Sequence, residues 1–149
     1  RSMNLLDMKP LTNRDYFVRG CTALLDAVGK TIQGVKKEYK ACAGEKPHVI
    51  FVIITDGLEN ASREYAADQI RKMISKQKKK HGWEFIFLGA NMDAVAEAAS
   101  MGISEDMAAN FEADSKGILK NYQVVEELVC DLRESGVVKQ DWKRDIEEG

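Results

Sequence analysis

The stretch Val-Ile-Phe-Val-Ile-Ile-Thr-Asp-Gly at residues 49–57 decides the fold of this chain. It is apolar and largely β-branched until it stops at Thr55, Asp56 and Gly57. A continuous apolar run of this length is typical of a parallel strand that is buried on both faces of its sheet. The carboxyl ends of such strands open into a crevice where ligands bind, so we expect Asp56 to lie at that crevice.

Helical and extended patterns alternate over the rest of the chain. The apolar spacing predicts helices over about 21–41, 66–82 and 115–134, a short helix that stops at Gly102, and strands over 48–55, 83–88 and 107–111. Strands that alternate with helices form right-handed βαβ units, so the predicted fold class is α/β, a Rossmann-like parallel sheet flanked by helices. The Gly-x-Gly-x-x-Gly phosphate cradle of dinucleotide-binding proteins does not occur in the sequence. We expect one domain over residues 1–136 and a polar C-terminal tail over 137–149.

A threonine upstream of the apolar strand offers a second oxygen ligand. Residues 19–27 read Arg-Gly-Cys-Thr-Ala-Leu-Leu-Asp-Ala, which puts Thr22 at the mouth of the first predicted helix. A hydroxyl and a carboxylate are hard oxygen ligands of the kind that Mg²⁺, Mn²⁺ and Ca²⁺ accept. Thr22 and Asp56 together therefore predict half of a metal site.

These two segments carry a resemblance to a known family. Gly-x-Thr-x-Leu-x-Asp-Ala followed by a strand that ends in Thr-Asp-Gly resembles the von Willebrand factor A-type domain, and in particular its soluble bacterial members. The likeness continues through residues 59–65 and 82–91 and covers roughly residues 15–135. It implies a divalent-metal-dependent protein-binding module, not an enzyme. By motif match, Thr22 and Asp56 would hold Mg²⁺, or Mn²⁺ or Ca²⁺, and an acidic residue of a protein partner would complete the coordination.

The third part of the family's metal site, an Asp-x-Ser-x-Ser loop, does not occur in this chain. The resemblance therefore implies a domain that lacks its first strands and first helix, with an incomplete metal site that binds Mg²⁺ weakly or not at all. In the family fold the strand that ends at Asp56 lies beside the first strand. We expect the edge of residues 49–54 to be unpaired and to join copies of the chain as a homodimer or swapped oligomer.

Cys21 offers an alternative in a different functional class. A thiol at a helix N-terminus beside Arg19 favours the thiolate form and could act as the nucleophile of a thiol-dependent hydrolase or phosphatase. No histidine closely precedes the cysteine, since the two histidines are His48 and His81. The binding module is the favoured hypothesis, and the thiol enzyme stays open as the alternative.

Five polar residues near the predicted metal pair have two possible roles each. Glu59, Asn60, Ser62 and Arg63 follow the Asp-Gly turn, where they could cap the second predicted helix or project toward a ligand. Capping is the expected role for Ser62. Asp26 lies one turn beyond Thr22, where it could orient a metal ligand or serve as a carboxylate at a helix start.

Composition excludes several classes of partner. The chain has 149 residues, of which 44% are hydrophobic and 31% charged, and a net charge of −2, so it has no general attraction to nucleic acid or to acidic membranes. No apolar stretch approaches the ~20 residues of a membrane span. Three cysteines without Cys-x-x-Cys spacing argue against a disulfide framework or a structural zinc site and favour a cytoplasmic location.

Overall fold

The computed structural model describes residues 22–147 apart from positions 91, 137 and 140. The order of the elements confirms the predicted α/β class, a small and open Rossmann-like arrangement. The elements are α1 (Leu24–Ala41), β1 (Ile50–Thr55), α2 (Ala67–His81), β2 (Glu84–Ala90), α3 (Ala94–Ser100), the 3-10 helix η2 (Glu105–Met107), β3 (Ala108–Phe111), α4 (Ser115–Ser135) and α5 (Arg144–Glu147).

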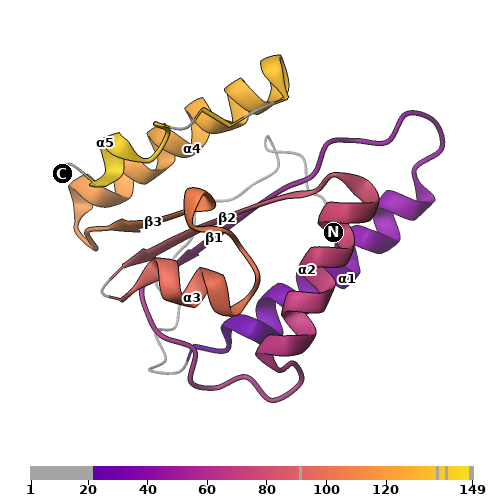
Figure 1. Ribbon diagram of the computed structural model, residues 1–149, viewed down its shortest axis with the longest axis horizontal. Helices are drawn as coiled ribbons and strands as arrows, with labels where there is room; N and C mark the ends of the chain where they lie inside the picture. The colour runs from indigo at the N-terminus through magenta and orange to yellow at the C-terminus, as the bar shows by residue number, and fades with distance from the viewer. Residues whose placement is uncertain (1–21, 91, 137, 140, 148–149) are drawn as a thin grey trace, which may run out of the picture.

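The three strands form a parallel sheet in the order β1-β2-β3. The register aligns Ile50 with Glu84 and Phe87 with Ala108. In Figure 1, α1 and α2 lie together on one side of the sheet and α4 and α5 on the other, while α3 contacts β2 and β3. Helices on both faces explain why β2, in the middle, is an almost continuous buried run, as a central parallel strand should be.

Aromatic side chains hold the core between β1, β2 and α1. The ring of Phe51 stacks on those of Phe85 and Trp83, with centroids 5.0 and 5.6 Å apart. Tyr39 of α1 meets the edge of Trp83 at 5.5 Å. Residues of α1 at positions 24, 28 and 32 are buried at helical spacing, which is why this segment folds as an amphipathic helix against the sheet.

The C-terminal segment is part of the same core. The sequence predicts a polar tail after residue 136, but the side chains of Trp142 and Ile146 are buried against the sheet and α4. Trp142 Nε1 donates a hydrogen bond to the carbonyl of Asp106 at 2.7 Å, which ties the segment to η2. Val138, Trp142 and Ile146 recur every four residues, a helical spacing that the prediction of a polar tail overlooked.

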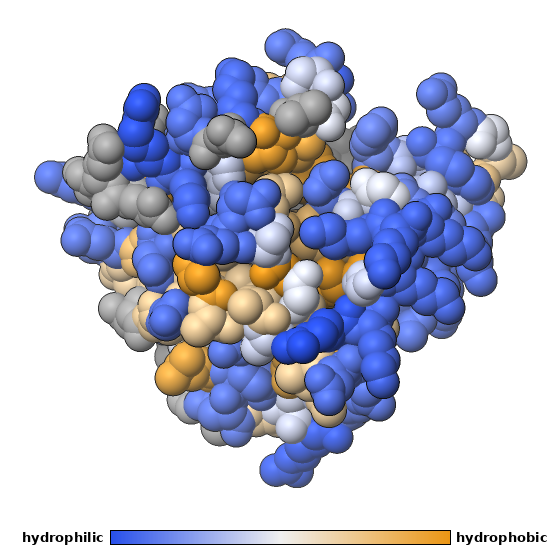
Figure 2. All heavy atoms as spheres, viewed as in Figure 1, coloured by the Kyte–Doolittle hydropathy of each residue, from blue (hydrophilic) through white to orange (hydrophobic). Residues whose placement is uncertain are grey.

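The surface of the described residues carries both hydrophilic and hydrophobic side chains. Figure 2 shows hydrophilic residues over much of α1 and α2, with hydrophobic residues gathered nearer the middle of the view. None of the described helices is both long and apolar enough to cross a bilayer. Large hydrophobic side chains that remain exposed are Ile54, Leu58, Ile118, Leu119 and Tyr122.

Candidate functional site

Thr22 contacts the turn that follows β1 at the carboxyl edge of the sheet. Asp56 directly follows β1, and Thr22 stands just before α1. The approach is close, because a Cβ atom added to Gly57 would lie only 2.9 Å from Thr22 Oγ1. Glycine at position 57 leaves room for the threonine hydroxyl beside the turn. Thr22 therefore contacts the residue that follows Asp56, although the two segments are far apart along the chain.

The backbone of Thr22 is fixed by Asn60. The amide of Thr22 donates to Asn60 Oδ1 at 2.8 Å, and the Thr22 carbonyl accepts from the amides of Asn60 and Ala61 at 3.1 and 3.2 Å. The Thr22 hydroxyl and the exposed Asp56 carboxylate, in contrast, form no hydrogen bond or ion pair with any residue that the structure describes. Their oxygen atoms remain available to a ligand.

Glu59 caps α1 from a distant part of the chain. Ala23, at the start of the helix, has no side chain that could accept from the free amides of the first turn. Glu59 Oε2 accepts from the amide of Leu25 at 2.8 Å, and Glu59 Oε1 accepts from the amides of Ala61 and Ser62 at 2.9 and 2.7 Å. The carboxylate therefore joins the loop after β1 to the N-terminus of α1, where the helix dipole favours negative charge.

Ser62 and Asp26 complete the connection in both directions. Ser62 Oγ accepts from the amide of Asp26 at 3.0 Å and donates to Glu59 at 2.7 Å. The Asp26 carboxylate in turn accepts from the amides of Arg63, Glu64 and Tyr65, each at 2.9 Å. We call Asp26, Glu59 and Ser62 the α1 clamp. The side-chain oxygen atoms of these three residues accept hydrogen bonds within the protein. Their role in the structure is therefore to hold the loop after β1 against the start of α1.

Hydrogen bonding keeps the two carboxylates of the α1 clamp ionised. Backbone hydrogen bonds, that from Arg63 above all, lower the pKa of Asp26 against the opposing effect of burial. Burial alone would raise the pKa of Glu59, but hydrogen bonds from the Ser62 hydroxyl and from the Leu25, Ser62 and Ala61 amides outweigh it and lower the pKa. Both groups are therefore charged at neutral pH, and the clamp is closed under those conditions.

The sequence pattern did not reveal the partners of the α1 clamp. The expectation that Ser62 caps the second helix is wrong, because Ser62 caps α1 and α2 begins only at Ala67. At the start of α2 the amide of Ala66 donates to Gln69 Oε1 at 2.9 Å. A capping box is recognised from residues three apart, whereas Glu59 and Leu25 are 34 positions apart. A long-range contact of this kind leaves no periodic signal.

Cys21, the nucleophile of the alternative hypothesis, falls outside the described residues. Within the described part of the chain, no three side chains of His, Cys, Asp or Glu gather closely enough to hold a metal ion. Any metal at Thr22 and Asp56 would therefore need water or further groups to complete its coordination.

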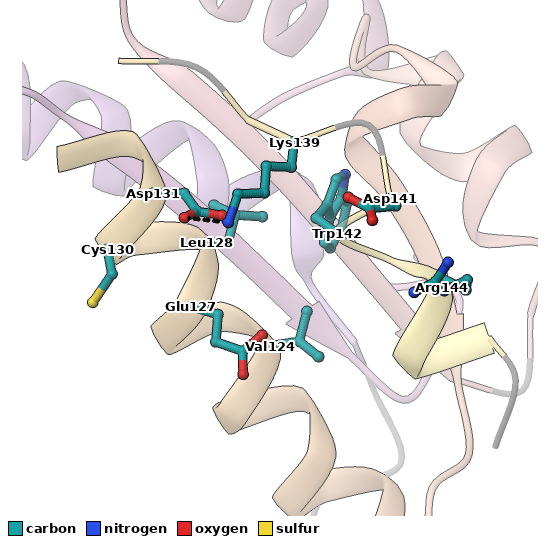
Figure 3. Close-up of a pocket in the computed structure, with 9 residues that line it drawn as sticks. All are labelled: Val124, Glu127, Leu128, Cys130, Asp131, Lys139, Asp141, Trp142 and Arg144. Carbon is teal, nitrogen blue, oxygen red and sulfur yellow. Dashed lines mark ion pairs between the residues drawn. The ribbon is translucent and has the colours of Figure 1, made fainter. Parts of the chain in front are cut away.

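A cavity of about 300 Å³ lies between α4 and the C-terminal segment, away from the Thr22 and Asp56 pair. Figure 3 shows Lys139 of the C-terminal segment reaching Asp131 of α4, with which it forms an ion pair of 2.8 Å, and Trp142 farther along the same segment. The hydrogen bond to Asp131 raises the pKa of Lys139. Glu127, Asp141 and Arg144 also line the cavity, so its walls carry charged groups of both signs.

Compared with protein-family models, with curated proteins and with solved structures, this chain matches none. The resemblance to the von Willebrand factor A-type family therefore depends on the quoted sequence motifs.

Proposed function

We propose that this chain belongs to a domain of the von Willebrand factor A type and acts as a binding module for another protein. In this proposal a divalent cation, Mg²⁺ or a similar hard ion, is bound in part by Thr22 and Asp56. An acidic side chain of the partner then replaces a water molecule on the cation. The cation would supply the attraction between two carboxylates that otherwise repel each other.

The observation that carries the proposal is the contact between Thr22 and the turn after β1. The Thr22 hydroxyl lies against Gly57, next to Asp56, while both candidate ligands are free of partners among the described residues. The side chains of the α1 clamp, in contrast, all accept hydrogen bonds from backbone amides. A rigid frame around two unengaged oxygen ligands is the arrangement that a metal site requires.

The expected affinity of the chain for metal is low. Mg²⁺ takes about six oxygen ligands and gives up its water shell reluctantly. Thr22 and Asp56 supply two of these positions, so water must fill most of the remainder. We therefore expect a dissociation constant for Mg²⁺ on the order of millimolar, the weak end of the range for hard cations bound by oxygen ligands.

Titration calorimetry with Mg²⁺ tests the proposal. We expect weak binding that is lost in Asp56→Asn and in Thr22→Val, two substitutions that remove ligand chemistry with little change in volume. Asp106→Asn is the matched control, because Asp106 is also an exposed carboxylate but lies in η2, at the amino end of the sheet. Binding that survives Asp56→Asn, or that Asp106→Asn weakens equally, would refute the site.

A further inference from the structure

Lysines gather where α1 and α2 end. Residues 36–46 and 76–81 carry eight lysines against two glutamates. In Figure 1 the two helices lie together on one side of the sheet. Their last turns meet, because the ring of Tyr39 in α1 lies 4.8 Å from the ring of His81 in α2. The two stretches are separate in the sequence and form one surface near the amino end of the sheet.

Four of these lysines lie close to the imidazole of His81, and we call them the lysine cluster. They are Lys36 and Lys40 of α1, Lys46 of the following loop and Lys80 of α2. Burial above all, and then the charges of these four lysines, lowers the pKa of His81. Charges on a protein surface act only over a short distance in salt solution, so three segments of the chain bring positive charge to one place.

The lysine cluster has no balancing carboxylate among the described residues. Lys46 donates to backbone carbonyls at the end of α1, at 3.0 and 2.6 Å, and so complements the negative end of that helix. Lys36, Lys40 and Lys80 form no hydrogen bond or ion pair within the described part of the chain. Like charges held near one another repel, so this surface attracts an anionic partner.

We propose that the lysine cluster binds a short acidic segment of a partner protein, a run of several Asp or Glu residues. An ammonium group on a flexible stem accepts a carboxylate in many orientations, so an extended acidic segment requires no preformed pocket. The cluster lies near the amino end of the sheet, whereas Thr22 contacts the turn at the carboxyl edge. The two surfaces are separate, and binding to the lysine cluster requires no metal.

The remaining charge of the chain favours a short acidic segment over a nucleic acid. The net charge is −2, and residues 105–147 carry eleven acidic side chains against six basic ones. A long polyanion meets this negative charge, whereas a segment confined to the lysine cluster does not. Single-stranded nucleic acids also bind through exposed aromatic rings that stack on the bases. Here Lys46 lies over the ring of Tyr39 at 5.5 Å and Trp83 is only 1% exposed, so neither ring is open to a base.

Fluorescence anisotropy with a labelled octaglutamate peptide tests the surface. The peptide should bind saturably at low salt, and added salt should weaken the binding. The double variant Lys36→Gln, Lys40→Gln should raise the Kd about fivefold or more, because two surface charge contacts are lost. Lys116→Gln, Lys120→Gln is the matched control, since it removes two lysines four positions apart on α4, one exposed and one half-buried, as in the cluster. It should leave the affinity unchanged.

Several results would overturn the proposal. Equal weakening by both double variants would show that the peptide responds to net charge alone. The absence of saturable binding, or tighter binding of an eight-nucleotide thymidine strand of similar charge, would exclude an acidic protein segment as the preferred occupant. Asp56→Asn should bind octaglutamate at least as tightly as the unmutated chain, with or without Mg²⁺. Loss of binding in this variant would place the peptide at the candidate metal site instead.

An NMR titration of His81 locates the bound peptide. The chain has two histidines, so His48→Gln leaves the ring signals of His81 alone. In this background, saturating octaglutamate should raise the pKa of His81, because carboxylates favour the imidazolium form and offset the lysines of α1, the loop and α2. Lys36→Gln, Lys40→Gln should raise the same pKa without peptide. A pKa that stays unchanged at saturation would place the peptide elsewhere and overturn the proposal.

Discussion

Thr22 and Gly57 are packed so tightly that residue 57 has no room for a side chain: a Cβ atom there would lie 2.9 Å from the Thr22 hydroxyl oxygen. This contact sets the distance between the start of α1 and the turn after β1. Asp56 is the neighbour of Gly57 in the same turn, so the contact also fixes the backbone from which its carboxylate projects. The geometry of the candidate site is therefore a matter of packing as well as of hydrogen bonding.

Gly57→Ala should lower the free energy of unfolding by about 1–3 kcal/mol, the usual cost of an overpacked contact. Thr22→Ala removes the opposing oxygen, so the double variant should recover most of the loss. Urea denaturation of the four proteins of this cycle measures the coupling. Gly34→Ala serves as control, since no atom lies within 4 Å of the Cβ position at this helical glycine, and it should be neutral or slightly stabilising. If Gly57→Ala lowers the free energy of unfolding equally in the unmutated chain and in the Thr22→Ala variant, the proposed contact is contradicted.

Glu59→Gln should destabilise the protein by roughly 1–3 kcal/mol, because a neutral amide replaces a carboxylate that accepts several charge-assisted hydrogen bonds. The loss should be larger than that of Glu126→Gln, because Glu126 is exposed on α4 and forms no hydrogen bond or ion pair within the described residues. Chemical denaturation compares the two variants. If Glu59→Gln is as stable as the unmutated chain, the α1 clamp contributes little to the stability of the fold.

The α1 clamp should make stability depend on acid pH. The folded-state pKa of Glu59 lies below its ordinary value of 4.5, and that of Asp26 below 3.8. A depressed folded pKa gives stability that is complete above the ordinary value and is lost as the pH falls through the folded pKa. We therefore expect the unfolding midpoint to fall steadily below about pH 4.5. The combined variant Asp26→Asn, Glu59→Gln should show a flatter acid profile, and an unchanged slope would contradict the clamp.

The alternative enzyme hypothesis makes a separate prediction at Cys21. If the binding-module proposal holds, Cys21→Ser should leave the fold and the Mg²⁺ affinity unchanged, because serine replaces the thiol with a group of similar size. Circular dichroism and the calorimetric titration measure both. Phosphatase or thiol-transfer turnover by the unmutated chain that disappears in Cys21→Ser would instead favour the thiol-dependent enzyme.

The fold could be predicted from the sequence because its signals are local. The apolar run at residues 49–55 and the helical spacing of α1 each lie within one element, and the βαβ order then fixes a parallel sheet. The two motifs predict that Thr22 and Asp56 belong to one site, and the structure shows Thr22 against Gly57, the neighbour of Asp56. The burial of Trp142 was overlooked, although Val138, Trp142 and Ile146 recur at helical spacing. The α1 clamp was not predicted, because it depends on contacts between residues more than 30 positions apart. Such contacts follow from the packed structure and leave no pattern in the sequence.

Paramagnetic broadening by Mn²⁺ in the NMR spectrum of the ¹⁵N-labelled chain tests the central claim most directly, since it locates even a weak metal site. Mn²⁺ at substoichiometric concentration should broaden the amide signals of Asp56 and Gly57 first, together with Thr22 across the contact. The amide of Asp106, at the opposite edge of the sheet, should stay sharp, and Asp56→Asn should abolish the selective effect. Broadening that begins elsewhere, or that spreads evenly over the acidic surface, would contradict a metal site at Thr22 and Asp56.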